Sequence, residues 1–248
     1  MEVLHIVKRF GPVGGMEECV FRLCQELDKK GISVTILCER DFSDENCNNC
    51  HIVKLPKSIK KPRWFSHLRF SRNVNKWLSD HPAKLRLVHS HERQCLHHVT
   101  TIYSTLYNFP PKGIQLNSPR SFANEYLERR ELNSRFVKAI VPLSNLVARQ
   151  IRTKHPECIE KLRTPITPAV SMALTSRKPD VPSDSHRAGK TIGFIGREWK
   201  RKGLLKVIDI WRSIRTEQPD LRLRLAGFGP NTDLGFSTEE KGSVDIYG

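Results

Sequence analysis

The chain has 248 residues, of which 38% are apolar and 27% are charged, and these values exclude a largely disordered protein. No apolar run approaches the about 20 residues of a membrane-spanning helix, and the N-terminal apolar run is too short for a signal peptide, so we expect a cytoplasmic protein. The seven cysteines favour reduced thiols over a disulfide framework because their number is odd.

The formal net charge of +16 is unevenly distributed. Residues 1–50 contain six lysines and arginines against nine aspartates and glutamates, whereas residues 51–100 contain eleven against two. Such a local excess of positive charge predicts a polyanionic partner. A nucleic acid, an anionic membrane surface and a phosphorylated substrate all fit that description, and the charge does not choose among them.

Apolar runs that predict strands alternate with periodic runs that predict helices. The predicted strands are 3–10, 33–38, 50–56, 86–90, 97–103 and 137–144. The predicted helices are 16–30, 66–80, 120–134 and a segment that follows residue 144 and ends near residue 154. Alternation at this spacing predicts an α/β fold with a doubly wound, mainly parallel, Rossmann-like sheet.

A second, shorter domain follows a segment rich in Pro, Ser and Thr. We expect an N-terminal domain at 1–165, a linker at 166–189 and a partial domain at 190–248. The last of these contains predicted strands at 190–196 and 221–227, an amphipathic helix at 203–215 and the start of a third strand in "VDIYG". Two or three strands do not close a doubly wound domain, so we expect this domain to be incomplete.

The loop "GPVGG" separates the first strand from the first helix. Unpaired backbone N–H groups at a helix N-terminus bind anions, and Gly14 and Gly15 would let a phosphate approach closely. The spacing matches neither the dinucleotide-binding G-x-G-x-x-G motif nor the P-loop. A tight turn with no ligand is the alternative.

The stretch "GREWKRKG" (196–203) follows a predicted strand and precedes a predicted helix. Its cations therefore lie at the carboxyl end of a strand, where open α/β sheets bind ligands. Arginine grips a phosphate through two hydrogen bonds and lysine adds a point charge. The pattern thus indicates an anion site at Arg197 and Lys202, with a solvated run of charge as the alternative.

Two further groups of residues have some of the spacing of metal sites. Only His89 and His91 share a strand face among the cluster of His89, His91, His97 and His98, and no acidic or cysteine ligand set accompanies them. The segment "CNNCH" (47–51) has a single C-x-x-C pair without a second pair. We therefore expect no metal.

The segment 60–81 interleaves aromatic residues with cations. Such a basic helix is typical of binding to an anionic bilayer, and the pattern also suits single-stranded nucleic acid or a core-facing helix with a basic outer face. No helix-turn-helix, RRM or zinc-finger pattern is present, so we expect no specific nucleic-acid partner. The residues predicted to form this membrane or acceptor surface are Lys60, Lys61, Arg63, Trp64, Arg69, Arg72 and Lys76.

The chain resembles the GT-B glycosyltransferases of the family-4, retaining type over nearly its whole length. "GPVGGMEE" is similar to that family's glycine loop, "LERRELNSRFVKAIVPLSNLVARQI" to the end of its first domain, and "ITPAV" to its interdomain crossing. "FIGREWKRKGL" resembles the element that binds the donor diphosphate, which implies that role for Arg197 and Lys202. "LAGFGP" resembles the turn near the nucleotide, which implies a role there for Gly227 and Gly229.

The resemblance implies transfer of a sugar from a nucleotide-diphosphate donor, UDP- or GDP-linked, to a saccharide or lipid-linked acceptor with retained configuration. It implies no metal and no further cofactor. "LERREL" and "EWKRKGL" look like bacterial transferases that build lipopolysaccharide or other surface glycans. We accordingly expect a cytoplasmic protein that associates peripherally with the inner face of the cell membrane.

Two departures from the family pattern affect the expected chemistry. The family commonly ends the strand before the cleft with a histidine, where this chain has Tyr103, so His91 and His98 are the candidate replacements. The family's Glu-x7-Glu segment lies downstream of "LAGFGP", and this chain ends before it. The alternative expectation is therefore an inactive, C-terminally truncated transferase that binds membranes or glycans.

Overall fold

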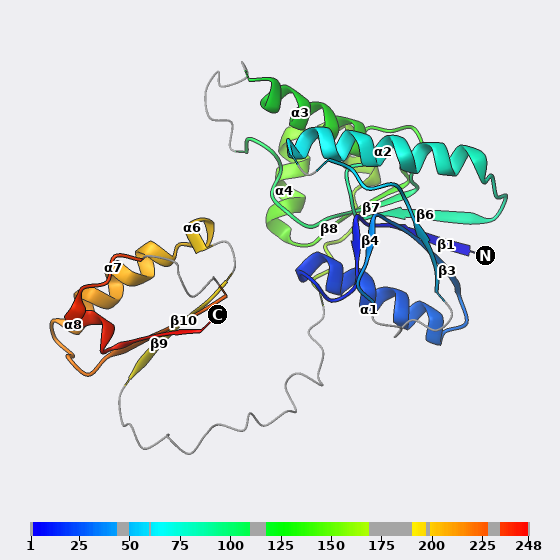
Figure 1. The fold of residues 1–248 in the computed structure, drawn as a ribbon. Helices are drawn as coiled ribbons and strands as arrows, with labels where there is room; N and C mark the ends of the chain where they lie inside the picture. The colour runs from blue at the N-terminus through cyan, green and yellow to red at the C-terminus, as the bar shows by residue number, and fades with distance from the viewer. Residues whose placement is uncertain are drawn as a thin grey trace. The chain divides into compact units, whose positions relative to one another are not determined.

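The computed structural model consists of two compact units, Met1–Val170 and Ser171–Gly248 (Figure 1). It describes residues 2–43, 50–59, 61–109, 118–168, 190–196, 199–227 and 234–247. Three predicted site residues, Lys60, Arg197 and Gly229, lie outside these ranges, as does most of the predicted linker. The division between the units falls within the segment 166–189 that the composition identified as a linker.

The N-terminal unit is built on a six-stranded sheet in which every neighbouring pair is parallel. Its order is β5-β3-β1-β6-β7-β8, which is 3-2-1-4-5-6 when these strands are numbered along the chain. The predicted doubly wound parallel sheet is thus confirmed. The strands are β1 (Glu2–Ile6), β3 (Ser33–Cys38), β5 (His51–Lys54), β6 (Arg86–Ser90), β7 (Val99–Ile102) and β8 (Ala139–Pro142).

The predicted strand 3–10 is interrupted after β1. Its last residues form β2 (Arg9–Phe10), which pairs in parallel with β4 (Arg40–Asp41) as a separate two-stranded sheet. The carbonyl of Lys8 accepts hydrogen bonds from the N–H groups of Glu39 and Arg40 at 3.0 and 3.2 Å, which links the two chain segments where they leave the main sheet. Both segments run from there toward the site described below.

Helices cover both faces of the main sheet. One apolar cluster joins α1 (Gly15–Lys29) to one face through Val20, Phe21 and Cys24. Another joins α2 (Arg63–Asp80) to the opposite face through Phe70 and Val74 (Figure 1). The remaining helices of this unit are α3 (Pro119–Leu132), α4 (Asn145–Lys154) and the 3-10 helix η1 (Pro156–Lys161).

Serines fix the starts of two of these helices. The hydroxyl of Ser118 accepts a hydrogen bond from the Ser121 N–H at the start of α3, and that of Ser144 accepts from the Val147 N–H at the start of α4. Each serine satisfies one of the N–H groups that a helix N-terminus leaves unpaired. The chain therefore enters both helices at defined residues.

The C-terminal unit has a three-stranded parallel sheet in the order β11-β10-β9, with all three predicted strands present. Helix α7 (Leu204–Arg215) packs on one face, where Trp211 is fully buried and donates to the Leu221 carbonyl at 3.1 Å. Among the described residues of the sheet, Ile195 is 82% exposed. The other elements are β9 (Thr191–Ile195), α6 (Trp199–Lys202), β10 (Arg222–Ala226), α8 (Thr238–Lys241) and β11 (Val244–Tyr247).

Within the described part of the chain, no helix is both long enough and apolar enough to cross a membrane.

Candidate active site

A cavity of about 1320 Å³ opens at the carboxyl ends of β1, β6 and β7 in the N-terminal unit. This is the edge at which doubly wound sheets bind ligands, beside the point where the strand order reverses between β1 and β6. The lining comes from the end of β7, from the segments that follow β1, β3, β5, β6 and β7, from the first turns of α1 and α2, and from both ends of α3. Most of the residues that line it have polar or charged side chains.

Gly14 and Gly15 form the start of α1 at this cavity. Gly14 is the N-cap with extended backbone and no side-chain cap, and the next residues, Met16 and Glu17, line the cavity. A Cβ on Gly14 would lie 2.5 Å from Glu17 Oε2, whereas a Cβ on Gly15 would meet nothing within 4 Å. Gly14 therefore gives room to the Glu17 carboxylate. The phosphate-binding role of both glycines stays a prediction.

Tyr103, directly beyond β7, lines the cavity and begins a chain of hydrogen bonds into the sheet. Its Oη lies 2.9 Å from His91 Nδ1, and His91 Nε2 lies 3.0 Å from Nδ1 of His5 on β1. A phenol that donates to Nδ1 makes His91 the tautomer protonated at Nε2, which in turn donates to His5. The structure thus brings two of the three predicted catalytic residues together.

These groups are uncharged near neutral pH. Burial lowers the pKa of His5 to about 3 and that of the neighbouring His89 to about 4, and it lowers the pKa of His91 well below its usual value. Burial also raises the pKa of Tyr103 above its usual value. Tyr103 consequently has a neutral hydroxyl, and His91 orients that hydroxyl without adding charge.

His98, the third predicted catalytic residue, is not among the residues that line the cavity. Its Nδ1 accepts a hydrogen bond of 3.0 Å from the Val88 N–H, so the ring is used within the sheet. Sequence reasoning had not included His5, which lies 86 residues from His91 along the chain. The pairing of β1 with β6 places His5 opposite His89, and no local sequence pattern reports that pairing.

The same rings form the first of two groups with metal-like spacing. Ligand atoms of His5, His89 and His91 lie within 4.8 Å of one another. Several of their nitrogens already form hydrogen bonds, His89 Nε2 with Thr101 Oγ1 at 2.8 Å and His91 with Tyr103 and His5, whereas the buried His5 Nε2 has no partner among the described residues. A metal ion would have to replace those bonds. The expectation that no metal binds here stays a prediction.

Two carboxyl groups of the cavity titrate near neutral pH. Burial raises the pKa of Glu92 to about 7, and its Oε1 accepts a hydrogen bond of 3.2 Å from the Lys8 N–H. Burial raises the pKa of Glu131 to about 8, and this carboxyl accepts from Thr100 Oγ1 at 2.8 Å. His67 Nδ1 lies 3.6 Å from Glu92, but burial lowers its pKa to about 4. The sequence alone did not indicate Glu131 as a residue of the site.

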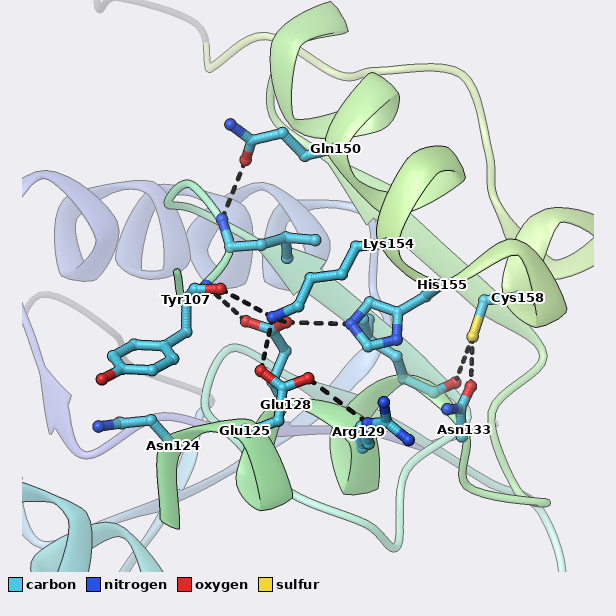
Figure 2. Close-up of polar contacts among 12 residues, drawn as sticks. Tyr107, Asn124, Glu125, Glu128, Arg129, Asn133, Gln150, Lys154, His155 and Cys158 are labelled. Carbon is cyan, nitrogen blue, oxygen red and sulfur yellow. Dashed lines mark hydrogen bonds and ion pairs between the residues drawn. The ribbon is translucent and has the colours of Figure 1, made fainter. Parts of the chain in front are cut away.

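An ionic network formed by side chains of α3 and α4 contacts the loop that follows β7 (Figure 2). Lys154 Nζ donates to Glu125 at 2.8 Å, to Glu128 at 2.5 Å and to the Tyr107 carbonyl at 2.7 Å. The Tyr107 N–H in turn donates to Glu128 at 2.6 Å. Helices α3 and α4 are thereby joined to the loop that contains Tyr103 and Tyr107.

Glu128 is the centre of that network. Burial alone would raise its pKa, but hydrogen bonds from His155 Nε2, at 3.0 Å, and from Lys154 leave the pKa below its usual value. Glu125, Glu128 and His155 make up the second group with metal-like spacing, and the Lys154 ammonium already supplies the positive charge among them. The arrangement is that of a structural ion cluster.

The predicted surface of 60–76 is divided by the start of α2. Lys61, Arg63 and Trp64 line the cavity. The remaining cations lie farther along the helix, exposed beside a buried face formed by Phe70 and Val74. These remaining cations are Arg69, Arg72 and Lys76.

In the C-terminal unit, Lys202 lies at the carboxyl end of β9. A Cβ on Gly196 would be only 2.6 Å from Lys202 Cδ, so the lysine side chain crosses the glycine. Gly227, at the end of β10, has φ of +97°, and a Cβ there would lie 3.0 Å from the Gly196 carbonyl carbon. Both glycines are needed for this close approach. The roles of Lys202 and Gly227 stay predictions.

The chain was compared with known families and structures. The model of Glycosyltransferase Family 4 matches residues 13–170. The solved structure of WaaG, a glycosyltransferase involved in lipopolysaccharide biosynthesis, has a TM-score of 0.79 and 15% identity, covering 99% of this chain and 69% of that one. Anabaena Alr3699/HepE, in complex with UDP and glucose, has a TM-score of 0.62 and 15% identity, covering 91% and 60%.

A glycosyltransferase from Rickettsia africae gives a TM-score of 0.59 at 15% identity, covering 99% of this chain and 67% of that one. A comparison with curated proteins found no match. At these identities the solved structures show the fold, which is the GT-B type that the sequence predicted. The family model covers well over half of the residues, and the chain therefore belongs to Glycosyltransferase Family 4.

Proposed function

We propose that the protein transfers a sugar from a nucleotide-diphosphate donor, UDP- or GDP-linked, to a saccharide or lipid-linked acceptor in bacterial surface-glycan synthesis. The observation that carries the proposal is the polar cavity at the carboxyl edge of the sheet, inside the part of the chain that matches the family. The solved structures of WaaG, a glycosyltransferase involved in lipopolysaccharide biosynthesis, and of HepE with UDP and glucose support the process and the donor class.

The resemblance of the stretch 196–203 to the family's donor element supports a role for Arg197 and Lys202 in binding the donor diphosphate, and Lys202 lies in α6, beyond the carboxyl end of β9. The resemblance of the glycine loop supports a phosphate contact for Gly14 and Gly15, where α1 begins. As the glycosidic bond to the donor breaks, negative charge grows on the departing diphosphate, and these groups stabilise it. The charge compensation comes from the protein, so we propose a metal-independent reaction, and the resemblance to the family-4, retaining type supports transfer with retained configuration. Gly227 and Gly229 would border the nucleotide.

On the acceptor side, Tyr103 is the proposed contact with a reacting sugar. Tyr103 lines the cavity, and its hydroxyl donates to His91, so the oxygen keeps the capacity to accept a hydrogen bond from a sugar hydroxyl. His98, which is held by the Val88 N–H, is the weaker candidate. The exposed cations Arg69, Arg72 and Lys76 support peripheral attachment to the anionic inner face of the cell membrane.

The test is transfer or hydrolysis with a panel of UDP- and GDP-sugars. Lys202→Ala is expected to lower kcat/KM by about 10²- to 10³-fold, the usual cost of losing one group that stabilises developing charge. Lys206→Ala is the matched control, because Lys206 is an exposed lysine of the adjacent α7 and its loss changes the net charge equally. Unchanged turnover in Lys202→Ala would contradict the assigned role.

A further inference from the structure

The cavity of the N-terminal unit holds more positive than negative charge. Its lining includes seven cationic side chains, and two of them, Lys8 and Arg9, are paired with Glu39 and Glu17. Arg93 donates to the carbonyl and side-chain oxygens of Asn124. Within the described ranges, the other four have no acidic partner within ion-pair distance. These four are Arg40, Lys61, Arg63 and Arg120.

The acidic residues of the cavity do not balance this charge. Glu128 is paired with the Lys154 ammonium and accepts a hydrogen bond from His155. Burial raises the pKa of Glu92 to about 7 and that of Glu131 to about 8, so both are protonated to a substantial degree near neutral pH. The four unpaired cations therefore face a cavity that contains little compensating negative charge.

Three helices also direct their N-termini at this cavity. First-turn residues of α1, α2 and α3 all belong to its lining, namely Met16, Arg63 and Arg120. Neither α2 nor α3 has an acidic residue in its first turn, and the N-cap of α2, Pro62, forms no side-chain cap. Helix N-termini attract anions, and that of α2 has neither a side-chain cap nor an acidic residue, whereas Glu17 and Glu18 lie in the first turn of α1 and Ser118 caps α3.

The cavity is also suited to a sugar. Trp64 and Tyr107 border it with half-buried aromatic rings, and Ser104 and Thr105 offer hydrogen-bonding hydroxyls. A volume of about 1320 Å³ exceeds what one inorganic phosphate needs. The surroundings fit an occupant that has both a sugar ring and a negative charge.

We propose that this cavity binds the acceptor through a phosphate group on the saccharide, held chiefly by Arg63 and Arg120 and supported by Arg40 and Lys61. The inference rests on the proposed sugar transfer, because it assigns the N-terminal cavity to the acceptor. It narrows the acceptor to phosphorylated saccharides. Two arginines on the first turns of different helices grip a phosphate from two directions, which a neutral acceptor would not require.

The proposal is tested by calorimetry with glucose 6-phosphate and unphosphorylated glucose as probes. The wild-type chain is expected to bind glucose 6-phosphate at least about tenfold more tightly than glucose, with affinity that falls as salt rises. The double variant Arg63→Gln/Arg120→Gln should lose this preference and keep the same weak affinity for glucose. Arg149→Gln/Arg152→Gln, which removes two exposed arginines of α4 outside the cavity, should leave it unchanged.

Equal binding of the two probes, or an unchanged preference in the Arg63→Gln/Arg120→Gln variant, would overturn the proposal. So would phosphate-dependent binding to phosphatidylglycerol vesicles through these arginines without any binding of glucose 6-phosphate, since the ligand would then be a lipid headgroup. Measuring UDP binding to the wild-type chain and to Lys202→Ala distinguishes failure of this acceptor inference from failure of the proposed sugar transfer. If the wild-type chain binds UDP but shows no preference for glucose 6-phosphate, only this inference is contradicted. If neither the wild-type chain nor any variant binds UDP or transfers a sugar, the proposed function is contradicted.

Discussion

The two units follow the same strand-then-helix plan but differ in what they bury. All 18 buried polar or charged residues of the described chain lie in the N-terminal unit, between His5 and His155. In the C-terminal unit the buried residues are apolar, and α7 packs them against one face of three strands. Burial of polar groups costs free energy unless each is hydrogen-bonded. The N-terminal unit therefore buries polar side chains despite this cost in free energy, and the described part of the C-terminal unit does not.

The comparison predicts that the smaller unit depends most on a single side chain. Trp211→Ala should destabilise the C-terminal unit by about 4 kcal/mol, because a large buried ring and its bond to the Leu221 carbonyl are both lost. Hydrogen exchange of β10 amides should accelerate strongly, and exchange of β1 amides should not change. Trp211→Phe, which keeps much of the apolar contact, is the control with a smaller effect. Equal acceleration in β1 would show that the units are not independent.

The N-terminal unit should respond most to loss of charge compensation in its network. Lys154→Met is expected to lower its free energy of unfolding by about 3 kcal/mol, since Glu125 and Glu128 would lose their shared cation. Urea unfolding followed through exchange of β7 amides measures the loss. Arg129→Met is the control, because Arg129 is 67% exposed and its pair with Glu125 contributes at most about 1 kcal/mol. A loss as small as the control's would contradict the assigned role of the network.

The next largest expected difference between the units is in how their free energy of unfolding changes at acidic pH. The pKa of His89 is about 4 in the folded chain and about 6.5 in the unfolded chain. Its contribution to the free energy of unfolding is therefore complete above pH 6.5 and is lost as the pH falls toward 4. At pH 5 the loss is up to about 2 kcal/mol. Glu92 and Glu131 act oppositely, because their raised pKa values make the folded state more stable as pH falls from 8 toward 4.5.

His89→Gln isolates the histidine contribution, since glutamine keeps a hydrogen-bonding group near Thr101 but does not titrate. Between pH 7 and pH 5, the free energy of unfolding of the variant should fall by up to about 2 kcal/mol less than that of the wild-type protein. Urea unfolding at both pH values measures the difference. Identical pH dependence in the two proteins would contradict the lowered pKa of His89. The C-terminal unit, which has no buried histidine among its described residues, should not respond.

Helix caps should give the smallest difference between the units. Ser144→Ala removes the cap of the ten-residue helix α4 and should cost about 1 kcal/mol. Ser237→Ala removes a capping box from the four-residue helix α8, which has no buried residue, and should cost less than half of that value. Thermal unfolding of the two variants measures both effects. A larger cost for Ser237→Ala would contradict the account of how each unit is stabilised.

The sequence predicted the order of strands and helices well, because strand and helix periodicities are local. It failed where contacts join distant segments. The link between His5 and His91 depends on β1 lying beside β6, which the topology determines. Similarly, α3 has charged residues around its circumference, and nothing local indicates that Glu128 and Glu131 point inward toward buried partners.

The basic segment 60–76 also shows a limit of prediction from sequence. Composition grouped Lys61 and Arg63 with Arg69, Arg72 and Lys76 as one surface. The helix begins at Arg63, so its first turn reaches the cavity and the later cations lie outside the cavity lining. Helical geometry, rather than composition, decides which charges belong to the site.

The strand order of the six-stranded sheet has a consequence for how acceptor preference can be changed. The sheet contributes buried apolar residues, whereas the segments at 61–64, 91–93, 103–107 and 120–124 supply much of the cavity lining. Specificity and framework are therefore encoded in separate stretches of the gene. Exchange of these four segments between relatives, by recombination or by grafting, should transfer acceptor choice while β1, β3 and β6 keep their packing.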